Sequence, residues 1–206
     1  MSFKLGTVSG KAVLIKDDHY YDVASLSEGA ISSDSVEALK FQTELSDLYE
    51  TLSEENASGN LSEVELGNPV PKSPNCYAVG LNYRKHAEES GMDIPEVPMI
   101  FTKHTSCFVG PKANVEMRSD YVDWEVELVA VIGKEGKNIS KENALDHVAG
   151  LCVGQDISDR PAQFATTPAM FNLGKSFDTY GPMGPALVSL DSVSYTHLTL
   201  PTIFRV

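Results

Sequence analysis

The sequence is short of cysteine, of basic residues and of long apolar runs, and each shortage excludes a class of protein. Three cysteines in 206 residues, none of them in a Cys-x-x-Cys pair, exclude a disulfide scaffold. Lys and Arg total 16 against 29 Asp and Glu, a net charge of −13, which argues against nucleic acid and anionic membranes as partners. No apolar run approaches the roughly 18 residues of a membrane span, and Met1 to Gly6 lacks the apolar core of a signal peptide. We therefore expect a soluble, reduced protein in the cytoplasm.

The remaining composition, 42% apolar and 22% charged, is that of an ordinary globular protein. Acidic residues are concentrated at the N-terminal end, and the segment 53–74 is polar with Asn-Pro and Ser-Pro turns. We expect a small N-terminal domain and linker at 1–68, followed by a larger domain that begins at residue 69.

Short apolar runs predict more strand than helix. A hairpin is expected at 3–8 and 11–15, and a helix at 34–52 with Ser32 or Ser33 as its cap. Short helices are expected at 82–90 and 141–147, the second capped by Ser140, and further strands at 76–80, 99–102, 124–132, 151–155 and 182–188. This order predicts a β-rich α+β fold.

The strand at 124–132 carries two carboxylates on one face. Side chains alternate along a strand, so Glu125 and Glu127 point the same way, and a cation between them would relieve their repulsion. Oxygen ligands favour Mg²⁺, Mn²⁺ or Ca²⁺, and Asp156 could add a third where the next apolar strand ends. The alternative interpretation is a solvated strand face and a turn residue.

Four further polar residues are candidates for chemistry. His86 and Glu89 lie three apart on a predicted helix, where a carboxylate can orient an imidazole as a general base, although surface pairs of this kind are common. Lys175 stands in a Gly-Lys-Ser that lacks the rest of a phosphate loop, and it could meet an oxyanion. Arg160 could clamp a substrate carboxylate.

The order of these fragments resembles the fumarylacetoacetate hydrolase family over about residues 75–190. The segments that carry the resemblance are Gly80 to Glu89, Phe101 to Lys103, Val109 to Pro111, Asp123 to Leu128, Val131 to Lys134, Gln155 to Ser158, Arg160, and Gly174 to Thr179.

The resemblance implies a role for each of these candidates. Glu125, Glu127 and Asp156 become the ligands of Mg²⁺, Mn²⁺ or Ca²⁺. His86 and Glu89 become the pair that activates water, and Lys175 the residue that polarises the substrate. Arg160 and Gln163 hold the substrate or shape its pocket. The usual Ala-Arg-Asp stretch reads Ser158-Asp159-Arg160-Pro161 here, so the contacts of the family's Asp after the Arg are not carried over.

The resemblance also implies a mixed β-roll, a homodimer of the full-length protein, and a substrate that is a small 2-oxo or 2,4-dioxo acid. The first expectation is metal-dependent hydrolysis of a C–C bond in an acylpyruvate-like acid. The alternatives are an isomerase, decarboxylase or dehydratase of a 2-oxo acid, or an inactive metal-binding relic.

The resemblance stops at about Asp191. We expect residues 192–206 to be a non-native tail, which leaves the catalytic domain at 69–191 incomplete. Because a roll without its closing strands exposes sheet edges, we expect this 206-residue form to be poorly stable and inactive.

Overall fold

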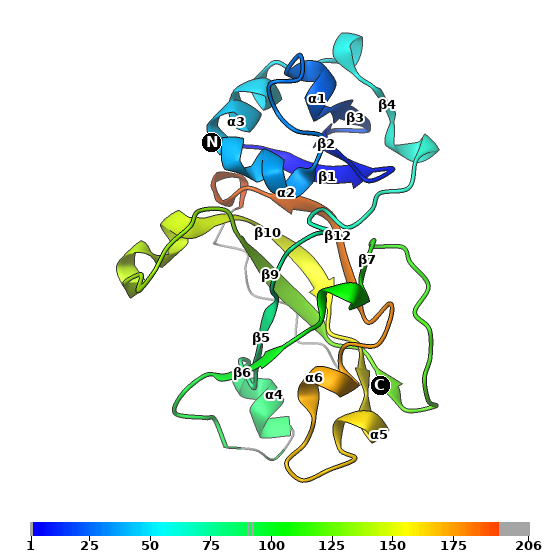
Figure 1. Cartoon of the computed structure of the whole chain (residues 1–206), viewed down its shortest axis with the longest axis vertical. Coiled ribbons are helices and arrows are strands. Elements are labelled where there is room, and N and C mark those ends of the chain that lie inside the picture. The colour runs from blue at the N-terminus through cyan, green and yellow to red at the C-terminus, as the bar shows by residue number, and fades with distance from the viewer. Residues whose placement is uncertain (1, 90, 92, 194–206) are drawn as a thin grey trace.

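The computed structural model describes residues 2–89, 91 and 93–193, without the side chains of His86 and Glu89. Its main sheet is antiparallel except for one short strand (Figure 1). Its strands follow the order β4-β3-β2-β1-β12-β10-β9, and β7 pairs with β12 in parallel. The strands are β1 Lys4–Val8, β2 Lys11–Lys16, β3 His19–Asp22, β4 Gly59–Asn60, β7 Phe108–Val109, β9 Val126–Ile132, β10 Val148–Gln155 and β12 Gly181–Val188.

The expected N-terminal hairpin is present as β1 and β2. Its two-residue turn, Ser9 and Gly10, has φ angles of 50° and 76°. Positive φ at both positions matches the twist of the strands that such a turn joins, and glycine adopts it without strain.

The prediction of one continuous helix at 34–52 is wrong. The segment forms α2 Ser35–Ala38, the 3₁₀ turn η1 Leu39–Phe41 and α3 Gln42–Glu50. Phe41, with φ −116° and ψ 45°, leaves the helical conformation, which breaks the run. The cap is Asp34, whose Oδ1 accepts from the N–H groups of Val36 and Glu37, and not a serine.

The predicted helix at 141–147 is likewise a 3₁₀ helix, η5 Lys141–His147, and the Ser140 side chain makes no capping bond there. Its stretch lies between β9 and β10.

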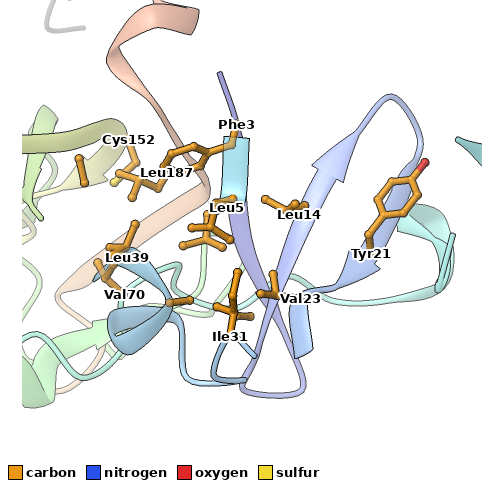
Figure 2. Close-up of a cluster of buried hydrophobic side chains, with 14 of the residues drawn as sticks. Phe3, Leu5, Leu14, Tyr21, Val23, Ile31, Leu39, Val70, Cys152 and Leu187 are labelled. Carbon is orange, nitrogen blue, oxygen red and sulfur yellow. The ribbon is translucent and has the colours of Figure 1, made fainter. Parts of the chain in front are cut away.

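The main core joins side chains of β1 and β2 to side chains of β10 and β12. Figure 2 shows Phe3 from the N-terminal end beside Leu187 of β12 and Cys152 of β10. In register, Leu5 pairs with Leu187 across the β1–β12 ladder, and both side chains are fully buried. The boundary between 1–68 and 69–191 stays a prediction, since residues on both sides of it share this sheet and this core.

A second group of short elements lies below the main sheet in Figure 1. It contains two small sheets and three short helices. They are β5 Tyr77–Gly80 with β6 Met99–Thr102, β8 Val122–Asp123 with β11 Ser158–Asp159, α4 Arg84–Glu89, α5 Arg160–Gln163 and α6 Phe171–Gly174.

The other regular elements of the described residues are one short α-helix, α1 Val23–Leu26, and the 3₁₀ helices η2 Glu54–Asn56, η3 Leu61–Glu63, η4 Thr105–Cys107 and η6 Leu190–Ser192. The β-rich α+β class predicted from the sequence is confirmed. In the described part of the chain, no helix has the length and apolarity required to cross a bilayer. Most of the expected tail, residues 194–206, lies outside the described residues.

Candidate active site

Strand β9 and the residue before it present their carboxylates inward. Leu128 and Ile132 are 41% and 65% exposed, whereas Val129 and Val131 pack against the main core. Because side chains alternate, Glu125 and Glu127 point to the same side as these two valines. The two glutamates therefore do not lie on the solvated face that the alternative interpretation required.

Strand β10 delivers Asp156 to the same place. Its Gly154 pairs with Glu127, and beyond the strand the Asp156 N–H donates to the Glu125 carbonyl at 2.8 Å. Asp156 is 6% exposed. The three predicted ligands thus lie on the ends of two paired strands.

Lys175, directly after α6, joins two of these carboxylates. Its Nζ donates to Glu125 Oε2 at 2.7 Å, to Asp156 Oδ2 at 2.8 Å and to Ser158 Oγ at 2.8 Å. The lysine side chain is 5% exposed and its Nζ lies 5.5 Å from the centroid of the Phe101 ring. The structure therefore brings together Lys175, Glu125 and Asp156, while the roles assigned to them stay predictions.

A second buried lysine, Lys103, was not predicted as a site residue. Its Nζ donates to Asp156 Oδ1 at 2.8 Å and to the carbonyl oxygens of Lys175 and Tyr180. The sequence offers one signal for Lys103 as a site residue, since it directly follows the short apolar strand Met99–Thr102.

Arg160 and Gln163 are both on α5 and touch each other. Arg160 donates to Gln163 Oε1 at 2.8 Å, to Asp123 Oδ2 at 2.7 Å and to Glu125 Oε1 at 2.6 Å. Asp159, which precedes Arg160, caps this helix by accepting from the Ala162 N–H at 2.9 Å. Arg160 thus orients the Glu125 carboxylate.

The two glutamates experience opposite electrostatic environments. Burial raises the pKa of the Glu125 carboxyl, but the charges and hydrogen bonds of Lys175 and Arg160 outweigh burial and hold the pKa below its usual range. Burial, together with the charges of Asp156 and Glu125, raises the pKa of Glu127 to about 7. Negative charge thus accumulates around Glu127 without an equal cationic partner.

The donor set fits a hard divalent cation in its chemistry. Oxygen ligands from three carboxylates are those that Mg²⁺, Mn²⁺ and Ca²⁺ take, and the crowding around Glu127 is the conflict that a cation relieves. Within the described residues, no three Asp, Glu, His or Cys side chains are arranged as they would be around one ion. A cation here therefore requires side chains such as Lys175, which bridges Glu125 and Asp156, to turn away.

A cavity of about 1210 Å³ opens in front of this group. The three carboxylates, both lysines, Arg160 and Gln163 all line it. Its apolar wall near Lys175 includes Phe101, Phe164 and Phe171. The ring centroid of Phe171 lies 5.7 Å from that of Phe101 and 6.3 Å from that of Phe164. The cavity is large enough for a small organic acid.

The predicted His86–Glu89 pair lies on α4, which follows the cavity-lining residues Leu81 and Asn82. Both side chains lie outside what the structure describes, so this pair stays a prediction.

Comparison with known proteins gives one family. Residues 75–203 match the profile described as "Fumarylacetoacetate (FAA) hydrolase C-terminal". Oxaloacetate tautomerase FAHD2A, mitochondrial, from Bos taurus is 45% identical over 138 residues, which are 66% of this chain and 44% of that protein. The chain thus spans less than half the length of this relative.

Solved structures share the fold. An HpcE-type protein from Mycobacterium smegmatis has a TM-score of 0.83 at 38% identity, covering 92% of this chain and 67% of that one. Fumarylacetoacetate hydrolase from Exiguobacterium antarcticum has a TM-score of 0.75 at 27% identity, covering 94% and 68%. The fold type expected from the resemblance is confirmed.

A maleylpyruvate hydrolase from Sphingobium sp. SYK-6, solved with manganese(II) and pyruvate, has a TM-score of 0.74 at 23% identity over 92% and 68% of the two chains. At this identity the likeness concerns the fold only.

The expectation of a cytoplasmic location is wrong, because the tautomerases from Bos taurus and Homo sapiens that resemble this chain are named as mitochondrial. The three free cysteines are compatible with both the cytosol and the mitochondrial matrix, so they did not separate these two locations.

Proposed function

We propose a tautomerase function for this chain, which belongs to the fumarylacetoacetate hydrolase family. In this proposal the protein uses a divalent cation to interconvert the keto and enol forms of a small 2-oxo acid of the oxaloacetate class. The observation that carries the proposal is the grouping of Glu125, Glu127 and Asp156 on two paired strands at the wall of one cavity. The similarity to oxaloacetate tautomerases favours tautomerisation over the hydrolysis expected first.

The reaction requires removal of a proton beside a carbonyl and stabilisation of the resulting enolate. Glu125, Glu127 and Asp156 would hold Mg²⁺ or Mn²⁺, which supplies a Lewis acid for the oxygens of the oxo acid. The Lys175 ammonium, next to these ligands, would donate to the negative charge that develops on the substrate.

The remaining groups hold and deprotonate the substrate. In the described contacts, Arg160 makes four hydrogen bonds to Asp123, Glu125 and Gln163. One of its five N–H groups would therefore be able to donate to a substrate oxygen. The predicted base is His86, oriented by Glu89, and it would move a proton between carbon and the imidazole nitrogen.

A second candidate is hydrolysis of a C–C bond in a 2,4-dioxo acid. The observation that favours it is the likeness to the Exiguobacterium antarcticum hydrolase, at 27% identity. Hydrolysis would use the same cation and Lys175, with water in place of carbon as the group that His86 deprotonates.

The test measures both reactions on one preparation. Decay of enol absorbance on addition of oxaloacetate reports tautomerisation, and release of pyruvate from acylpyruvates reports hydrolysis, each with Mg²⁺, with Mn²⁺ and with EDTA. We expect EDTA to abolish tautomerisation. Loss of an outer partner of a metal site lowers activity by about 10–100-fold, and Asp156→Asn should lower the rate of tautomerisation by more than this.

The matched control is Lys72→Met, which removes a lysine–carboxylate pair, Lys72 with Asp34 at 2.7 Å, whose lysine is largely in solvent and is not a predicted site residue. Its turnover should equal that of the unmodified protein. Turnover that is insensitive to EDTA would refute the proposed cation, and pyruvate release without tautomerisation would establish the second candidate.

We also propose a mitochondrial location, by similarity to the named relatives. Imaging of the tagged protein tests it. The homodimer stays a prediction, which light scattering on the purified protein tests.

A further inference from the structure

Lys103 is a buried cation whose three N–H groups all have protein acceptors. It is 6% exposed and donates to Asp156 Oδ1, to the Lys175 carbonyl and to the Tyr180 carbonyl. An ammonium has three donors and no acceptor, so the described contacts use its full hydrogen-bonding capacity. Two of the acceptors are main-chain oxygens, which cannot rotate away as side chains do.

Asp156 therefore has two oxygens in unlike positions. Oδ1 accepts from Lys103, which is tied to the backbone at residues 175 and 180. Oδ2 accepts from Lys175, whose other partners are the side chains of Glu125 and Ser158. Only Oδ2 shares a donor with a second predicted ligand, and so only Oδ2 faces the place where the carboxylates meet.

We propose that Lys103 is a positioning residue that keeps Asp156 a one-oxygen ligand and thereby makes this site select Mg²⁺ over Ca²⁺. The inference rests on the proposed function, because it presumes that Glu125, Glu127 and Asp156 bind a divalent cation.

The selectivity follows from what the two ions require. Mg²⁺ takes six ligands in near-ideal octahedral geometry and is usually bound through few carboxylate oxygens, keeping water for the rest. Ca²⁺ takes six to eight oxygens and is commonly held by a carboxylate through both oxygens. A lysine that donates to Oδ1 competes with Ca²⁺ for the second oxygen of Asp156, whereas Mg²⁺ requires only the other oxygen.

The experiment is a calorimetric titration of the unmodified protein, Lys103→Met and Lys103→Arg with MgCl₂ and, separately, with CaCl₂, without substrate. The quantity compared is the ratio of the Ca²⁺ Kd to the Mg²⁺ Kd. Removing a positive charge changes the affinity for both divalent ions in the same direction, so the charge effect largely cancels in this ratio.

We expect the ratio to exceed 1 in the unmodified protein and to fall by about tenfold in Lys103→Met, the lower end of the effect of outer partners on metal sites. Lys103→Arg keeps an N–H donor for Oδ1 and should keep most of the ratio. Lys72→Met should leave it unchanged, since that lysine pairs with Asp34 on the surface.

An unchanged ratio in Lys103→Met with a native circular dichroism spectrum overturns the inference, and so does a lost ratio in Lys103→Arg. If Lys103→Met does not fold, the unmodified protein still decides, because Ca²⁺ binding as tight as Mg²⁺ binding contradicts the proposal. Binding of neither ion overturns the proposed cation site itself. Cation-dependent turnover with an unaltered ratio refutes only the role of Lys103.

Discussion

Replacing Lys175 by Met removes one cation from between two carboxylates and leaves a side chain of similar size. Lys175 is 5% exposed, and the change deletes hydrogen bonds of 2.7 Å to Glu125 and 2.8 Å to Asp156. Removing one partner of a buried ion pair costs about 3–5 kcal/mol, because the other charge stays buried. Asp156 keeps Lys103 and Glu125 keeps Arg160, so we expect the lower end, about 3 kcal/mol of unfolding free energy.

For a chain of this size, about 1 kcal/mol corresponds to about 2–4 °C, so the Tm should fall by about 6–12 °C. The assay is equilibrium unfolding in urea with EDTA present, followed by circular dichroism and by the fluorescence of Trp124, the one tryptophan of the chain. The control, Lys72→Met, removes a lysine that is largely in solvent, and it should move the midpoint little.

A loss below about 1 kcal/mol, the range of exposed ion pairs, would refute the reasoning. It would mean that water reaches Glu125 and Asp156 freely. Adding Glu125→Gln to Lys175→Met removes one of the stranded charges, so the double variant should recover part of the lost stability, with a coupling of about 0.5–3 kcal/mol.

Two further predictions concern the core and the thiols. Leu187→Ala empties a fully buried position and should lower the free energy of unfolding in urea by about 2–5 kcal/mol. Leu173 is 46% exposed, so Leu173→Ala should change that free energy by no more than about 0.5 kcal/mol. Equal losses in the two variants would contradict the assigned core. Burial raises the pKa of both Cys107 and Cys152 to about 11. At pH 8 these two thiols should therefore react with a disulfide reagent only after urea is added. Rapid labelling of Cys152 in the native protein would contradict its burial.

The sheet of the N-terminal segment shows what local pattern predicts well. The Ser9-Gly10 turn between two apolar runs is sufficient for β1 and β2, because turn chemistry and alternation act over a few residues. The pairing of β1 with β12, which joins Leu5 to Leu187, could not be predicted in this way. Nothing within a few residues of either strand specifies a partner more than 180 residues away.

Strand β9 shows where a pattern is right and its interpretation incomplete. The alternation places Glu125 and Glu127 on one face, as predicted, and leaves open which face is buried. The apolar residues Leu128 and Ile132 would be assigned inward on composition, yet they are exposed while the glutamates line the cavity. The neighbouring strands decide this, and they are known only from the fold.

Lys103 is the clearest residue that sequence reasoning missed. A single lysine at the end of a short strand has the appearance of a surface charge, and burial is uncommon for this residue type. Its acceptors belong to residues 156, 175 and 180, so its role exists only once β10 and the segment after α6 are folded against β6.

The sequence by itself placed Glu125 and Glu127 on one face of a strand, through their two-residue spacing. Their role as ligands together with Asp156 is implied by the family resemblance and stays a prediction. The sequence determined the family as well, through the order of its motifs. Tertiary structure decided that Lys103 and Lys175 each hold one oxygen of Asp156, because a hydrogen bond depends on distance in space. Spacing along a strand specifies the direction of a side chain, whereas its partners depend on which distant segments pack beside it.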